Sequence, residues 1–214
     1  MREKSNNLKA GLARFLTITG DLMALEALWF VCSLPIITIG PSTCALFTVL
    51  LKIANGETTT VLSTFFSSFK SNFKQALCVG AFSLIAIVVI YVDASYALAV
   101  EGALQKVYII VSILLTAILL ITITYLNALI ARYNNTLKGH VSNAFKLAFV
   151  NPIQTIFMWL IILLPVALIF FVPPIILVYM GWFLILFAFS LPAYLCSKIM
   201  IKIFKKFDDR KEGA

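Results

Sequence analysis

The chain has 214 residues, of which 62% are hydrophobic and only 12% are charged, and its mean hydropathy is +1.02. This composition excludes a soluble globular protein and leaves no polar stretch long enough for a separate soluble domain. The net charge of +8 does not indicate nucleic acid, because the basic residues flank apolar segments. We therefore predict an all-α, polytopic membrane protein made of a single membrane domain, with the lipid bilayer as its surroundings and no nucleic-acid partner.

The first apolar segment follows a basic N-terminus and contains Asp21 and Glu26, with no small-residue cleavage pattern behind it. These features predict a retained membrane span and not a cleaved signal peptide.

Residues 15–54 form either one span or two. Pro35 disfavours continuation of the first helix, Gly40 permits a tight turn, and Pro41 suits the first position of a new helix. We therefore predict two spans joined by a structural turn at Pro35, Gly40 and Pro41. The second span has only fourteen residues, which rise ~21 Å, so whether it crosses the whole membrane is left open.

Between the spans lie two amphipathic segments, at about 60–74 and 139–150. In the first, Phe65, Phe69 and Phe73 recur every four residues and so share one helix face. We expect both segments to lie flat on the membrane with their apolar faces toward lipid. A shift of 76 residues superimposes them and lays residues 76–98, the span after the first, onto residues 152–174, which suggests a parallel repeat of interfacial helix and hairpin. The six predicted spans cover residues 15–34, 41–54, 76–98, 107–131, 153–172 and 175–195.

The distribution of basic residues favours six spans, arranged as three hairpins with both termini cytoplasmic. With six spans, sixteen of the seventeen Lys and Arg residues lie inside and only Lys106 lies outside. The alternative of five spans puts five of them on one side and twelve on the other. The sixteen are Arg2, Lys4, Lys9, Arg14, Lys52, Lys70, Lys74, Arg132, Lys138, Lys146, Lys198, Lys202, Lys205, Lys206, Arg210 and Lys211.

Four polar residues inside spans are the candidate functional residues: Asp21, Glu26, Asp93 and Asn127. An ionisable group in hydrocarbon costs ~2.5–3.5 kcal/mol, so each must face protein or water. One interpretation is a ladder of acids for protons or cations. The favoured one has Asp21 and Asp93 hydrated near the interfaces, and Glu26 protonated and hydrogen-bonded inside the bundle.

No catalytic, cofactor-binding or metal-binding motif is found in the sequence, so we predict a protein that is not an enzyme and holds no cofactor or metal. There is no GxSxG or GxxxxGK[ST] pattern. His140, the one histidine, lies in a basic segment and is expected to be a solvated loop side chain.

Three stretches carry a family resemblance: residues 20–41, which contain the Leu34-Pro-Ile-x-Thr-Ile-Gly-Pro41 turn, residues 65–76, and Ala131-Arg-Tyr133 followed by Asn143-Ala-Phe145. They resemble the YesL-like family of bacterial integral membrane proteins of unknown function. Glu26 departs from the family pattern, in which Asn is usual, and this puts a shared role for that position in doubt. The resemblance implies a helical bacterial membrane protein that is often encoded beside carbohydrate uptake systems, and it implies no established activity.

The expected function is therefore that of a non-enzymatic accessory component of carbohydrate ABC-type uptake, with ABC transporter permease subunits as partners. It would lie in the bacterial cell membrane as a multi-pass protein. The alternative is a small solute or ion transporter or channel in its own right, which the buried acids and the repeat would favour.

Overall fold

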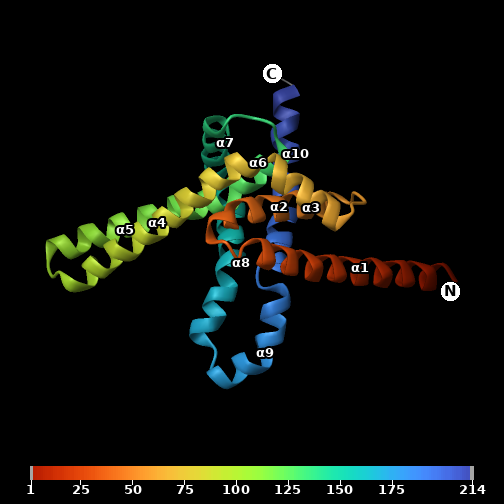
Figure 1. Cartoon of the computed structure of the whole chain (residues 1–214), viewed down its shortest axis with the longest axis horizontal. Coiled ribbons are helices and arrows are strands. Elements are labelled where there is room, and N and C mark those ends of the chain that lie inside the picture. Colours follow the sequence, from red (N-terminus) through yellow and green to blue (C-terminus); the bar gives the residue numbers. More distant parts are fainter. Residues whose placement is uncertain (1, 213–214) are drawn as a thin grey trace.

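The computed structural model describes residues 2–212, and every regular element in that part of the chain is a helix. The predicted all-helical fold is thus confirmed for the described residues. Four helices are long and apolar enough to cross a membrane, or up to six if each of two bent pairs is one span. Figure 1 shows the elements in chain order: α1 (Arg2–Cys32), the 3-10 turn η1 (Ile36–Thr38), α2 (Ile39–Asn55), α3 (Val61–Ser71), α4 (Phe73–Ala99), α5 (Ala103–Ile121), the π-helical turn η2 (Thr122–Leu126), α6 (Asn127–Arg132), α7 (Leu137–Val150), α8 (Pro152–Phe171), α9 (Pro174–Phe187) and α10 (Ser190–Glu212).

The short helix α2 lies at the centre of the fold. It contacts α1, α3, α4, α6 and α10, which pack around it (Figure 1). A helix that is apolar over most of its surface is stable when other helices cover it. Ala45, Val49 and Leu50 accordingly have no exposed surface. The segment that looked too short to be an ordinary span is therefore the core helix.

Two glycines let the backbones of α2 and α4 touch. A Cβ atom on Gly80 would lie 2.9 Å from both the Cα and the N atom of Gly40, and a Cβ on Gly40 would collide with the carbonyl oxygen of Ala76. The prediction that Gly40 forms the turn is wrong, because α2 already begins at Ile39. Gly40 is needed for close helix packing, as small residues often are in membrane bundles.

The turn itself is built from residues before Gly40. Helix α1 ends at Cys32, three residues before Pro35, as the sequence predicts. The Thr38 hydroxyl lies 2.6 Å from the Cys32 carbonyl oxygen and 2.7 Å from that of Pro35, so it can donate to either; the Pro35 carbonyl also accepts from the Thr38 N–H at 2.8 Å. Pro41 lies in the first turn of α2 and not at its first position, but there too its missing N–H has no partner to lose.

Two helical hairpins, α4–α5 and α8–α9, project from the core in different directions (Figure 1). Large apolar side chains cover their outer surfaces: Ile85 is 64% exposed and Phe171 is 87% exposed. Contiguous apolar surface of this kind fits lipid or the helices of another protein. The predicted repeat requires a short helix followed by a hairpin, and this order occurs twice, in α3–α4–α5 and in α7–α8–α9. Whether an axis relates the two units stays a prediction.

The last predicted span is not one continuous helix. Residues 175–195 correspond to α9 and the beginning of α10, with a break at Ala188 and Phe189. The helices on the two sides of this break are bent by 47°. A second bend, of 104°, separates α7 from α8 at Asn151, directly before Pro152.

Part of the aromatic face of α3 packs on protein and not on lipid. Phe65, Phe69 and Phe73 do share one face, with ring centroids 6.3 Å and 5.6 Å apart in successive pairs. Phe65 is completely buried in the core, however, while Leu62 and Phe66 are exposed. The expectation that Phe65 faces the membrane is therefore wrong. Phe69 and Phe73 are half-buried, and the flat placement of the segment on the membrane stays a prediction.

Helix α7 also turns one side inward. Leu147 and Ala148 are buried, and Val141 and Phe149 are exposed. Only part of its predicted apolar stripe is thus free to contact lipid.

Substitution of Gly80 by Ala tests the close approach of α2 and α4. We expect Gly80→Ala to destabilise the protein by about 1–3 kcal/mol, because the added methyl group meets a backbone that cannot move alone. The matched control is Gly20→Ala in α1, where a Cβ meets nothing within 4 Å. That change should be neutral or stabilise by up to about 1 kcal/mol, as Ala favours helix. Thermal unfolding in detergent compares the two, and equal stability would contradict the close contact.

Candidate functional site

The buried carboxylate of Glu26 forms hydrogen bonds with the backbone at the break between α9 and α10. Glu26 is only 6% exposed. Its Oε1 accepts a hydrogen bond from the backbone N–H of Phe189 at 3.1 Å, and its Oε2 accepts from the N–H of Ser190 at 2.6 Å. The first backbone donors of a helix have no partner within the helix. Glu26, from α1, therefore acts as an N-terminal cap for α10.

An aromatic contact reinforces this junction one helical turn further along α1. The rings of Trp29 and Phe189 stack, with centroids 4.0 Å apart and planes inclined by 29°. The indole N–H of Trp29 donates to the Thr43 hydroxyl of α2 at 3.1 Å. Glu26 and Trp29 thus hold α1, α2 and the α9–α10 break together.

The donors around Glu26 can be compared with the predicted state of its side chain. The prediction that Glu26 is buried and hydrogen-bonded within the bundle is confirmed. Both of its oxygens accept from backbone N–H groups, and the N-terminus of a helix favours negative charge. Both features suit a side chain that accepts hydrogen bonds through both oxygens, and the expectation that Glu26 is protonated stays a prediction.

The other candidate residues lie apart from this junction. Asp21 is half-buried, five residues before Glu26 on α1. Asp93 accepts a hydrogen bond from the Ser112 hydroxyl, which links the second half of α4 to the first half of α5. Asn127 is buried, and its Oδ1 has no hydrogen-bond partner among the described residues. The contacts of these residues therefore give no support to a ladder of acids.

A buried polar cluster lies beside the π-helical turn η2, and sequence reasoning missed it. The Tyr125 hydroxyl lies 2.8 Å from that of Thr155, which in turn lies 2.8 Å from the backbone oxygen of Asn151. The hydroxyls of Thr122 and Thr124 bond back to carbonyls four residues earlier. Two such threonines inside an apolar helix are the signal that could have indicated an irregular turn.

Two open polar grooves of about 340 and 390 Å³ adjoin near Lys52, at the end of α2. Hydroxyl groups dominate the larger groove, where the Thr48 and Ser68 hydroxyls lie 2.6 Å apart. The smaller groove includes Arg132, which pairs with Asp208 of α10 at 3.0 Å. Hydroxyl and cationic groups suit a polar or anionic ligand. The larger groove is lined by Thr48, Lys52, Ser63, Thr64, Ser67, Ser68, Ser71, Asn72 and Ala131.

His140 is not the solvated loop residue that its basic surroundings suggest. It lies in α7, and its side chain is 1% exposed. Burial lowers the pKa of His140, and the backbone of Asn135 opposes part of that fall. The sequence-based interpretation fails because α7 turns this face toward the core, although charged residues precede and follow it.

Comparisons with known proteins test the resemblance to the YesL-like family. Residues 22–94 match a family model described as a protein of unknown function, DUF624. The chain is also 27% identical over 206 residues to the uncharacterized protein YesL of Bacillus subtilis, and the alignment covers 94% of this chain and 93% of that protein. The resemblance to the YesL-like family is therefore confirmed. No solved structure matches the chain. The matched segment includes Glu26, the Pro35 turn and the core helix α2.

Replacement of Glu26 by Gln tests the capping role. An amide offers one acceptor and turns its NH2 group toward a backbone donor, so Glu26→Gln should lower stability by about 1.5–3 kcal/mol, the value of a hydrogen bond to a charged group. The matched control is Glu57→Gln. Glu57 is exposed and accepts only from Asn55 at 2.7 Å, so a change within about 0.5 kcal/mol is expected. Thermal unfolding in detergent measures both. A Gln variant as stable as the control would contradict the capping role of Glu26.

The burial of His140 predicts a pH dependence of stability. Because its pKa is lowered in the folded state, the unfolded chain binds a proton first as the pH falls. The contribution of the buried, neutral His140 to the stability of the folded state is fully present above the ordinary pKa of about 6.5, and it decreases as the pH drops below that value. Melting temperatures at pH 7.5 and 5.5 should thus differ more in the wild type than in His140→Leu, which lacks the one histidine. Equal differences in the two proteins would contradict this role.

Proposed function

We propose that the protein is a non-enzymatic integral membrane component that supports a carbohydrate uptake transporter of the ABC class, with permease subunits as its partners. The supporting observation is the structural role of Glu26 at the start of α10. Glu26, the one buried acid among the residues whose burial is described, accepts hydrogen bonds at the start of α10 with both oxygens and so has a structural role. The resemblance to the YesL-like family, whose members are often encoded beside carbohydrate uptake systems, favours the same function.

The exposed surfaces of the two hairpins suit such a partner. Ile85, Tyr91 and Phe171 are large apolar or aromatic residues of these hairpins, and they are 64%, 73% and 87% exposed. Helices of a permease would cover this apolar surface in place of lipid by close packing of side chains.

The same junction favours the alternative, a small solute or ion transporter. Transporters often bind ions or substrates where a membrane helix is broken, with the N-terminus of the second half pointing at an anionic group. The α9–α10 break with Glu26 has this arrangement. In that function Glu26 would release α10 when it binds a proton or a cation.

The orientation belongs to the proposal as well. The charge distribution supports six spans in the bacterial cell membrane, with both termini on the cytoplasmic side.

Site-specific cross-linking in native membranes tests the accessory function. A photoactivatable residue placed at Ile85 or Phe171 should capture permease subunits. The matched control is Leu50 in α2, which is fully buried and should capture none. Absence of permease subunits from both exposed positions would contradict the proposal. Flux of solute or protons through liposomes containing only the purified protein, lost in Glu26→Gln but not in Glu57→Gln, would establish the transporter instead.

A further inference from the structure

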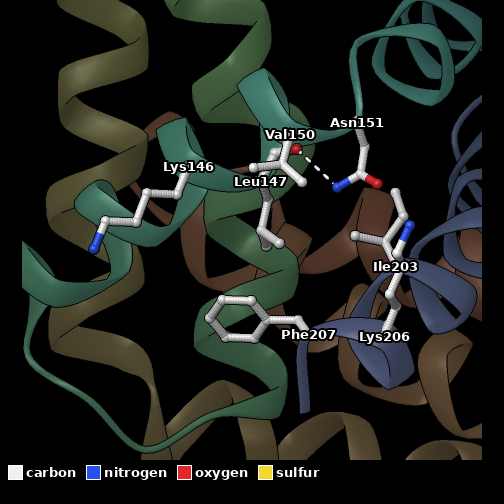
Figure 2. A pocket seen from close by; sticks show the side chains of 7 residues that line it. All are labelled: Lys146, Leu147, Val150, Asn151, Ile203, Lys206 and Phe207. Atoms are coloured by element: carbon white, nitrogen blue, oxygen red, sulfur yellow. Dashed lines mark hydrogen bonds between the residues drawn. The ribbon is translucent and has the colours of Figure 1, made fainter. Parts of the chain in front are cut away.

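A cavity of about 240 Å³ lies between α7 and α10, away from Glu26 and from the two polar grooves (Figure 2). Leu147 and Ile203 form buried apolar parts of its wall, and Phe207 adds an aromatic ring. Asn151 brings the main polar group, but its amide nitrogen already donates to the Leu147 carbonyl at 3.1 Å. The interior is thus suited to hydrocarbon.

Two lysines flank this apolar interior. Figure 2 shows Lys146 of α7 and Lys206 of α10 on opposite sides of the cavity. Both are exposed, and neither forms an ion pair with another described residue. Of the nearby acids, Asp208 is held by Arg132 and by the Tyr133 hydroxyl, and Asp209 is exposed beyond Lys206. The charge at the cavity is therefore positive and open to a ligand.

We infer that this cavity binds an anionic phospholipid, with part of an acyl chain inside the cavity and the phosphate at its rim, where the flexible side chains of Lys146 and Lys206 can turn toward it. Basic pockets between helices at a membrane surface bind the headgroups of such lipids. The cavity is smaller than the roughly 300–1,000 Å³ of a site that encloses a whole small ligand, so it fits one portion of a larger amphiphile. Val150 and Phe149, which are 55% and 77% exposed, continue the apolar surface outward from the cavity.

The test measures binding of phosphatidylglycerol to the purified full-length protein in detergent, by native mass spectrometry and by the rise in melting temperature. Each lysine near an anionic surface contributes about 1 kcal/mol, so Lys146→Gln with Lys206→Gln should weaken binding about 30-fold. The matched control is Lys138→Gln with Lys202→Gln. These residues lie on the same two helices, are exposed and do not line the cavity, so binding should stay within about 3-fold of wild type.

A second pair of variants tests the apolar part. Val150→Trp places a large ring at the edge of the cavity and should also weaken binding, whereas Val141→Trp on the same helix, outside the cavity, should not. Phosphatidylcholine and inorganic phosphate serve as ligand controls and should give little effect. Binding that is equal in the two lysine variants, equal for phosphatidylcholine, or reproduced by inorganic phosphate alone would overturn the inference.

Discussion

The backbone N–H groups at the start of α10 lie where protein excludes water, and each needs an acceptor within the chain. Glu26 provides it from a position 163 residues earlier in the sequence. This contact fixes α1 against α10, and α10 packs on α2 together with α3, α4 and α6. Without it, the break after α9 would leave buried donors unpaired, and the last helix would have no fixed starting point.

The core and the hairpins follow different physical rules. Around α2, packing is close enough that Gly40 and Gly80 touch through their backbones, and Phe65 turns away from lipid to join the core. In the α4–α5 hairpin, single polar contacts such as that of Ser112 with Asp93 connect helices whose outer surfaces are exposed and apolar. A rigid centre with apolar arms is the form expected of a protein whose outer surfaces meet lipid or other membrane helices.

Sequence reasoning predicts the features that depend on local patterns. The apolar segments, the end of α1 before Pro35 and the shared face of Phe65 and Phe69 all follow from spacing or residue type. It cannot predict which neighbour covers a face, since that depends on contacts between distant segments. The inward turn of Phe65, the burial of His140 and the packing role of Gly40 are of this kind. The partner of Glu26 is another, because a helix break between two apolar segments leaves no periodic signal.

Helix α10 is held at both ends, and this explains how its surface can carry a binding site. Glu26 fixes its first turn, and near its other end Asp208 accepts hydrogen bonds from Arg132 and the Tyr133 hydroxyl, which come from the end of α6 and the residue after it. Lys206 and Ile203 lie between these two sets of contacts along α10, on the side that faces α7. A ligand that joins α7 to α10 there would bind to a helix whose position is already set, so little ordering would oppose its binding. Because such a ligand binds only the folded arrangement, it would stabilise that arrangement by an amount that grows with the logarithm of its concentration once the site is mostly occupied. The bound lipid would then add one more contact between α10 and the rest of the protein.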